Sequence, residues 1–144
     1  MDMKRSKALF IALSMLLLTG LANSPTILAA EPYHLGVAMG LTGTGAPWSA
    51  DTVKGVELAV DEINSRGGFL NKHPIKLFIK DTRTKPSVAE QVVKDLIKKD
   101  KVQCIIGTYS SATALAIKPI CRENRVLHIA PISNSEDITK LDFS

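Results

Sequence analysis

Residues 55–68 read Gly-Val-Glu-Leu-Ala-Val-Asp-Glu-Ile-Asn-Ser-Arg-Gly-Gly, and their apolar residues recur with the period of an α-helix. The apolar positions that share one stripe of this helix are Val56, Ala59, Val60 and Ile63. Two consecutive glycines close the pattern, as glycine commonly does after the last turn of a helix. We therefore predict an amphipathic helix over residues 51–66.

Strand-like and helix-like segments alternate on both sides of this helix. Apolar extended segments predict strands at 34–39, 75–80, 102–106 and 126–129. Helical periodicity predicts further helices at 86–99 and 111–123, the second interrupted by Pro119, which predicts a kink or an early break. Strands and helices that alternate with short connections form a parallel sheet through right-handed crossovers, with helices on both faces. The predicted fold class is therefore α/β, a Rossmann-like parallel sheet with flanking helices.

The amino-terminal end of the chain has the pattern of a secretory signal. Three basic residues precede its apolar stretch: Lys4, Arg5 and Lys7. The apolar stretch, residues 8–18, is too short to span a bilayer comfortably, and small residues end the segment at Ala30. We predict a signal peptide over 1–30, cleaved after Ala30, and a periplasmic mature chain of residues 31–144. An uncleaved membrane anchor is the alternative.

Composition and motifs exclude several classes of function. The 144-residue chain has a net charge of only +4 and no basic patch interleaved with aromatic residues, which argues against nucleic acid as a partner. Its early glycines, Gly40, Gly43 and Gly45, do not form a G-x-G-x-x-G turn, and no P-loop is present. We find no motif of a hydrolase or protease, and the three histidines are scattered, with His128 expected to be packed in its strand. We therefore expect neither an enzyme nor a cofactor.

Two cysteines, Cys104 and Cys121, fall in the mature chain. Export to an oxidising compartment makes a disulfide between them possible, but buried free cysteine also packs well as a small apolar residue. The sequence leaves both alternatives open. Two thiols without clustered histidines do not make a metal site, so we expect no bound metal.

Ligands of such sheets bind beyond the carboxyl ends of the strands. The loops that should share this edge are 41–50, 81–86, 107–112 and 131–136. Ser110 and Ser111, preceded by Tyr109, enter the third helix, where free amides and the helix dipole favour an anion such as a carboxylate. The alternative is that one of these serines is only an N-cap.

Other residues at the same edge each have two possible roles. Trp48, in the first loop, is either a cover over a ligand or a packed hydrophobic residue. After the fourth strand, Ser133, Asn134 and Ser135 offer polar contacts or cap a turn beginning near Glu136.

Several segments together resemble one known family. These are residues 55–68, Ile75-Lys-Leu-Phe-Ile-Lys-Asp81 with Pro86, and Val102-Gln-Cys-Ile-Ile-Gly107 with Ser110-Ser111. They resemble the type I periplasmic binding proteins, and within these the leucine/isoleucine/valine receptors of ABC transporters. The resemblance covers nearly all of residues 33–140. It implies a two-lobed receptor that closes on an amino acid and presents it to a permease in the inner membrane.

The resemblance also implies a role for each residue at the edge. Ser111, with Ser110 beside it, would hold the carboxylate of the ligand, and Trp48 would cover the ligand side chain. The backbone of Ile132 and Ser133 would accept hydrogen bonds from the ammonium group. Asn134 stands where the family commonly has threonine, and its amide oxygen can also accept. Asp81 matches an acidic residue of the family that we interpret as structural.

The family pattern extends further than this sequence. We expect residues 31–144 to form a partial N-terminal lobe, an N-terminal fragment that binds amino acids weakly or not at all without a second lobe to close over the ligand. The alternatives are an extracellular sensor domain of the same fold and a truncated product without function. An exported enzyme would need a catalytic cluster, and a DNA-binding repressor a helix-turn-helix, which the sequence does not contain.

Overall fold

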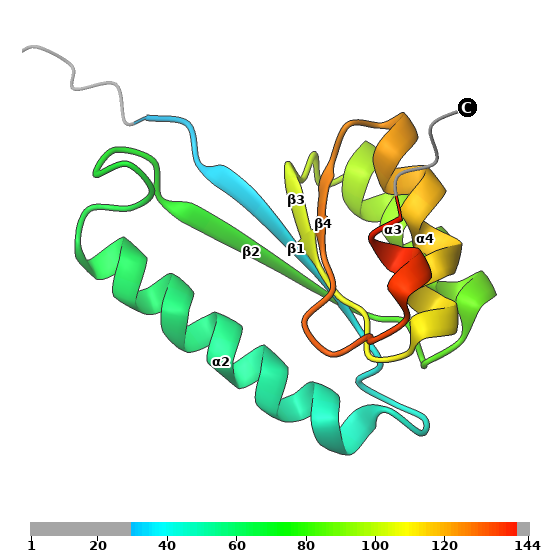
Figure 1. The fold of residues 1–144 in the computed structure, drawn as a ribbon. Coiled ribbons are helices and arrows are strands. Elements are labelled where there is room, and N and C mark those ends of the chain that lie inside the picture. Colours follow the sequence, from blue (N-terminus) through cyan, green and yellow to red (C-terminus); the bar gives the residue numbers. More distant parts are fainter. Residues whose placement is uncertain (1–29, 141–144) are drawn as a thin grey trace, which may run out of the picture.

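The computed structural model describes residues 30–140, which form a parallel sheet with helices on both faces. The elements in chain order are β1 (Tyr33–Met39), α2 (Ala46–Ser65), β2 (Ile75–Asp81), α3 (Pro86–Lys98), β3 (Cys104–Ile106), α4 (Ser111–Glu123), β4 (Leu127–Ile129) and the short 3-10 helix η1 (Glu136–Ile138). The four strands lie in the order β2-β1-β3-β4, and all pairs are parallel. Helix α2 covers one side of the sheet and α3 and α4 the other (Figure 1). The predicted α/β fold class is confirmed. The predicted signal peptide lies, except for Ala30, outside the described residues.

The main core lies between the sheet and the pair α3 and α4. Its buried members are Ala38, Ala89, Val93, Leu96, Val102, Ile105, Ile117 and Cys121. Gly36 allows the close packing of this layer, because a Cβ atom there would lie 3.3 Å from side-chain atoms of Ile105, Leu96 and Val102. Strand side chains alternate between faces, so Val37 and Met39 of β1 point to the α2 side, and both are fully buried.

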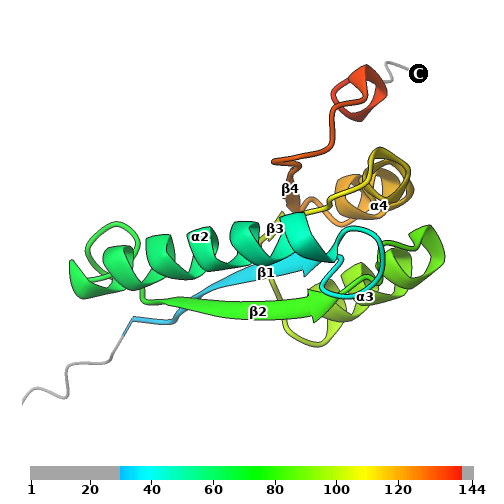
Figure 2. The same ribbon diagram turned by 90° about the horizontal axis from the view of Figure 1, so that it is seen from below.

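The structure corrects the predicted start of the first helix. Helix α2 begins at Ala46 rather than at residue 51, because Pro47 is accommodated in its first turn. Of the predicted stripe only Val60 is buried, whereas Ala59 and Ile63 are exposed. The reason is that α2 packs only on β1 and β2 (Figure 2), and within residues 30–140 no other helix covers that side of the sheet.

The remaining boundaries agree closely with the prediction. Helix α4 runs from Ser111 to Glu123 through Pro119, so the early break is not found. Strands β3 and β4 begin later than predicted, at Cys104 and Leu127, and β1 and β2 are each one residue longer. Within residues 30–140, no helix combines the length and apolar character needed to cross a bilayer.

Both cysteines are buried and free in the structure. Cys104 pairs with Leu35 in the register of β3 with β1, whereas its neighbour Ile105 points into the core shared with α3 and α4. Cys121 packs in that core, so the sheet separates the two thiols. Burial raises the pKa of Cys104, and burial, with a smaller effect from Cys104, raises that of Cys121 to about 12.

We predict that neither thiol reacts with a thiol reagent while the chain is folded. The thiolate is the reactive form, and burial disfavours it in both residues. Both thiols should react once the chain is denatured without reductant. A non-reduced mass two hydrogens below that of the reduced chain would show a disulfide and contradict this prediction.

Candidate functional site

The loops that follow the strands converge at the carboxyl edge of the sheet. One close approach is at Gly107, where a Cβ atom would lie 2.2 Å from the carbonyl oxygen of Ala38 near the end of β1. Only glycine fits there. The Gly107 N–H donates to the carbonyl oxygen of Ile129 (2.9 Å), and its own carbonyl accepts from His128 Nε2 (2.6 Å). Burial lowers the pKa of His128, which favours a neutral ring and agrees with its predicted packed position.

Asp81 joins the loops after β1 and β2. One carboxylate oxygen accepts from the backbone N–H groups of Leu41 (2.9 Å), Thr42 (3.2 Å) and Arg83 (2.7 Å). The other accepts from the Thr42 hydroxyl (2.5 Å). Desolvation opposes ionisation, but these hydrogen bonds outweigh it and hold the pKa of Asp81 below its ordinary value of 3.8. The structural role predicted for Asp81 is consistent with this geometry.

We predict that Asp81→Ala lowers the free energy of unfolding by about 1–2 kcal/mol, because it removes charge-assisted hydrogen bonds to three backbone amides. The folded-state pKa is depressed, so this stabilisation is present above the unfolded-state pKa and is lost as pH falls through the folded-state value. Urea denaturation at neutral and acidic pH measures both effects. Asp51→Ala, which removes a carboxylate 84% exposed, is the control and should change stability by less than about 0.5 kcal/mol. Equal effects of the two variants would contradict the prediction.

The amino-terminal end of α4 lies at this edge. Ser110 occupies the N-cap position in an extended conformation, but its side chain makes no capping hydrogen bond. The interpretation of Ser110 as only an N-cap is therefore not supported. Its carbonyl accepts from the Thr108 hydroxyl (2.9 Å). The first-turn amides of α4, without a side-chain cap, are groups that can bind an anion.

The loop after β4 contacts this helix terminus. The hydroxyl of Ser133 donates to the carbonyl oxygen of Thr108 (2.8 Å), and that of Ser111 donates to Asn134 Oδ1 (3.4 Å). Ser135 caps η1 by accepting from the Asp137 N–H (3.4 Å), which is one of the two alternatives that the sequence left open. Ile132, between these contacts and β4, is half-buried. The structure thus brings together the predicted residues of the two loops.

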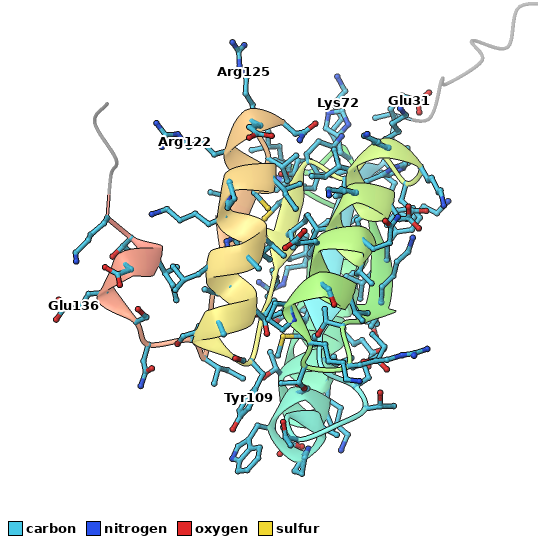
Figure 3. The ribbon with its side chains drawn as sticks, turned by 90° about the vertical axis from the view of Figure 1, so that its right-hand side faces the viewer. Glu31, Lys72, Tyr109, Arg122, Arg125 and Glu136 are labelled. Carbon is cyan, nitrogen blue, oxygen red and sulfur yellow. The ribbon has the colours of Figure 1, made fainter. Side chains whose placement is uncertain are left out.

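Trp48 also lies at the carboxyl edge of the sheet, but it belongs to a helix and not to the predicted loop. It lies in the first turn of α2, not in a loop, and its side chain is 56% exposed. The indole stacks on the ring of Tyr109, with centroids 5.2 Å apart and an interplanar angle of 15°. Tyr109 projects at the opposite end of the molecule from Glu31 and Lys72 (Figure 3). The sequence placed Tyr109 at the edge but gave no signal for this contact, because the two rings come from segments far apart in the chain, the first turn of α2 and the loop after β3.

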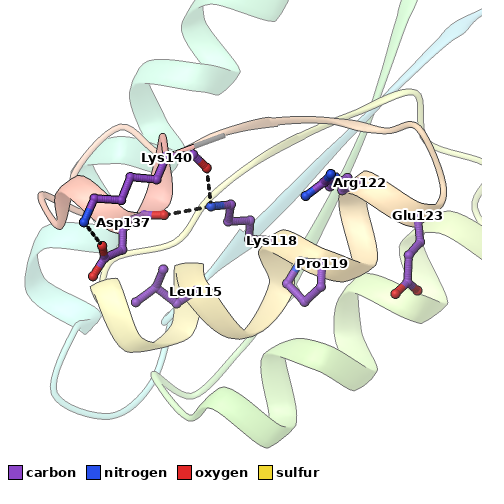
Figure 4. Close-up of a pocket in the computed structure, with 7 residues that line it drawn as sticks. All are labelled: Leu115, Lys118, Pro119, Arg122, Glu123, Asp137 and Lys140. Carbon is purple, nitrogen blue, oxygen red and sulfur yellow. Dashed lines mark hydrogen bonds and ion pairs between the residues drawn. The ribbon is translucent and has the colours of Figure 1, made fainter. Parts of the chain in front are cut away.

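A groove of about 790 Å³ lies elsewhere, on the outer face of α4 beside η1 (Figure 4). Lys118 crosses it and donates to the carbonyl oxygens of Asp137 (2.8 Å) and Lys140 (2.7 Å). Lys140 Nζ in turn donates to the carboxylate of Asp137 (2.6 Å). These contacts hold η1 against α4 and so support the loop that carries Asn134.

The chemistry of the edge suits reversible binding. It combines uncapped amides, hydroxyls, an amide oxygen and an exposed indole. Within residues 30–140, no three His, Cys, Asp or Glu side chains are grouped as a metal ion would require. Such a set can hold the charged and apolar parts of a small molecule, but it provides no activated nucleophile.

Comparison with known proteins agrees with a role in reversible binding. The family model described as periplasmic binding protein matches residues 32–142. The chain therefore belongs to the periplasmic binding protein family. Among its relatives are a Leu/Ile/Val-binding protein, BraC3, of Rhizobium johnstonii, 29% identical over 86% of this chain, and Leu/Ile/Val-binding protein homolog 2 of Brucella abortus, 32% identical over 76%.

Solved structures show the same fold. The branched-chain amino acid transporter substrate-binding protein LivJ of Streptococcus pneumoniae, in complex with isoleucine, superposes with a TM-score of 0.71 at 28% identity, covering 75% of this chain. The leucine-binding protein LivK of Thermotoga maritima gives 0.69 at 30% identity over 75%. The chain spans 33% and 29% of the two relatives' lengths and 31% and 30% of the two solved chains. The relatives are named as binding proteins, not enzymes.

Proposed function

We propose that this chain is part of the substrate-binding receptor of an ABC transporter for amino acids, with branched-chain amino acids as the favoured ligands. The observation that carries the proposal is the meeting of the uncapped α4 terminus, the Ser111–Asn134 contact and the exposed Trp48 at one edge. The names of the relatives, Leu/Ile/Val-binding proteins, support the choice of ligand.

In this proposal the ligand carboxylate lies at the first turn of α4. There it accepts hydrogen bonds from backbone amides and from the hydroxyl of Ser111, beside Ser110, and the positive end of the helix dipole favours its charge. The helix dipole contributes about 0.3–1 kcal/mol for such a charge at an exposed site. This requires Ser111 to turn its hydroxyl from Asn134 to the ligand, which the long 3.4 Å hydrogen bond permits.

The ammonium group of the ligand is assigned to the loop after β4, and its side chain to the first turn of α2. The carbonyls of Ile132 and Ser133 and the side-chain oxygen of Asn134 are acceptors for the ammonium group. The exposed indole of Trp48 covers the apolar side chain. All of these contacts are reversible, so the proposed activity is binding and involves no catalysis.

The location and partners follow from the same proposal. A chain carrying a cleaved signal over residues 1–30 reaches the periplasm, where it delivers its ligand to a permease in the inner membrane. Residues 31–144 form part of the N-terminal lobe, and a second lobe closes over the ligand in the whole receptor. A sensor domain of the same fold would bind in the same way, but the relatives' names favour transport.

The test is an NMR titration of the isotope-labelled 144-residue chain with L-leucine. We expect shifts at the amides of residues 110–112 and at the Trp48 indole, with a dissociation constant on the order of 1 mM or weaker, because a single lobe leaves the ligand exposed to water. Ser111→Ala should weaken binding about tenfold, the effect of one hydrogen bond to a charged group. Ser87→Ala is the matched control, since it makes the same change in the first turn of α3.

Two results would count against the proposal. Shifts centred away from residues 110–112, or equal effects of the two serine variants, would show that the α4 terminus does not hold the carboxylate. Micromolar affinity in the isolated chain would contradict the expectation that a second lobe is needed.

A further inference from the structure

Of the ring contacts among residues 30–140, only the one between Trp48 and Tyr109 lies at the carboxyl edge of the sheet. Their rings are nearly parallel at 15°, and one face of the indole is left for other contacts. Trp48 extends from the first turn of α2, where 56% of its surface is exposed. An indole so exposed would sample several rotamers without a partner, so the stack on Tyr109 restricts where its outer face lies.

The surrounding loops are shaped to admit the tyrosine ring. Gly45, just before α2, is buried, and a Cβ atom there would lie 2.7 Å from Cδ1 of Tyr109 and 2.8 Å from the hydroxyl of Thr84. The same Thr84 hydroxyl accepts from the Gly45 N–H (3.2 Å). The ring of Tyr109 thus packs against the loops after β1 and β2. It can do so only because residue 45 is a glycine and has no Cβ atom.

We propose that Tyr109 is a positioning residue of the ligand site. Its ring holds the Trp48 indole over the position of the ligand side chain, so the pair, rather than Trp48 alone, sets the preference for large apolar side chains. A pre-ordered indole loses less conformational freedom when a ligand packs against it, and this gain is larger for a bulky side chain than for a methyl group. The part of this inference that concerns selectivity rests on the proposed amino-acid site, whereas the positioning of Trp48 does not.

Trp48 is the sole tryptophan of the chain, so its fluorescence reports directly on the contact. The full chain, expressed with its own amino-terminal segment, is compared with Tyr109→Ala, Tyr109→Phe and Gly45→Ala. We expect Tyr109→Ala to shift the emission to longer wavelength and to increase quenching by acrylamide. Tyr109→Phe should show the same emission wavelength and the same quenching as the unaltered chain, because the stack needs the ring and not the hydroxyl. Gly45→Ala should resemble Tyr109→Ala although it leaves the tyrosine in place.

Phe69→Ala is the matched control, because it removes the tilted aromatic contact with Tyr33, outside the carboxyl edge, and should leave Trp48 emission unchanged. Circular dichroism establishes that each variant is folded. Tyr109→Ala removes a half-buried side chain from a loop and decides the question by itself if Gly45→Ala fails to fold.

The selectivity arm measures the affinity for leucine relative to alanine by the same NMR titration. We expect Tyr109→Ala to lower this ratio by about two- to tenfold, the range of one aromatic contact, and Tyr109→Phe to restore it. Unchanged Trp48 emission and quenching in Tyr109→Ala would overturn the positioning role. Changed emission with an unchanged ratio would overturn the role in selectivity. An unaltered chain that binds neither amino acid would contradict the proposed function, and the fluorescence arm would still decide the positioning role.

Discussion

The parallel pairing of β1 on both of its edges is the constraint on which the other features depend. β1 pairs with β2 along its full length and with β3 at its centre, and Val37, Ala38 and Met39 are fully buried. Parallel pairing places the carboxyl ends of these strands at one edge, so the loops that follow them must meet there. The absence of a side chain at Gly107 brings the loop after β3 against the carbonyl oxygen of Ala38.

The polar groups at this edge divide into two sets with different roles. The carboxylate of Asp81 and the hydroxyl of Ser133 join one loop to another, and the hydroxyl of Thr108 is engaged within its own loop. The α4 amides and the exposed indole of Trp48 are not used in that way, and the Ser111–Asn134 hydrogen bond is long enough to exchange. The first set supplies the rigidity that the second needs to recognise a small ligand with reversible contacts.

Within residues 30–140, the sequence predicted the order and type of every strand and α-helix, because apolar periodicity reports on which face of an element is buried. It placed the start of α2 too late, since the glycine-rich segment and Pro47 suggested a loop, and this put Trp48 in the wrong element. It also implied burial for Ala59 and Ile63, which depends on elements that pack against α2 and not on α2 itself. The Tyr109 stack was not predictable, because it requires the position of the loop after β3 relative to the first turn of α2.

The most direct test of this account is the convergence of the loops themselves, measured by nuclear Overhauser contacts in the isotope-labelled chain. The account predicts cross-peaks between Gly107 and Ala38, between Thr84 and Gly45, and between Ser133 and Thr108. Cross-peaks within the sheet but none between these loops would show that the fold forms without assembling the site, and would contradict the account.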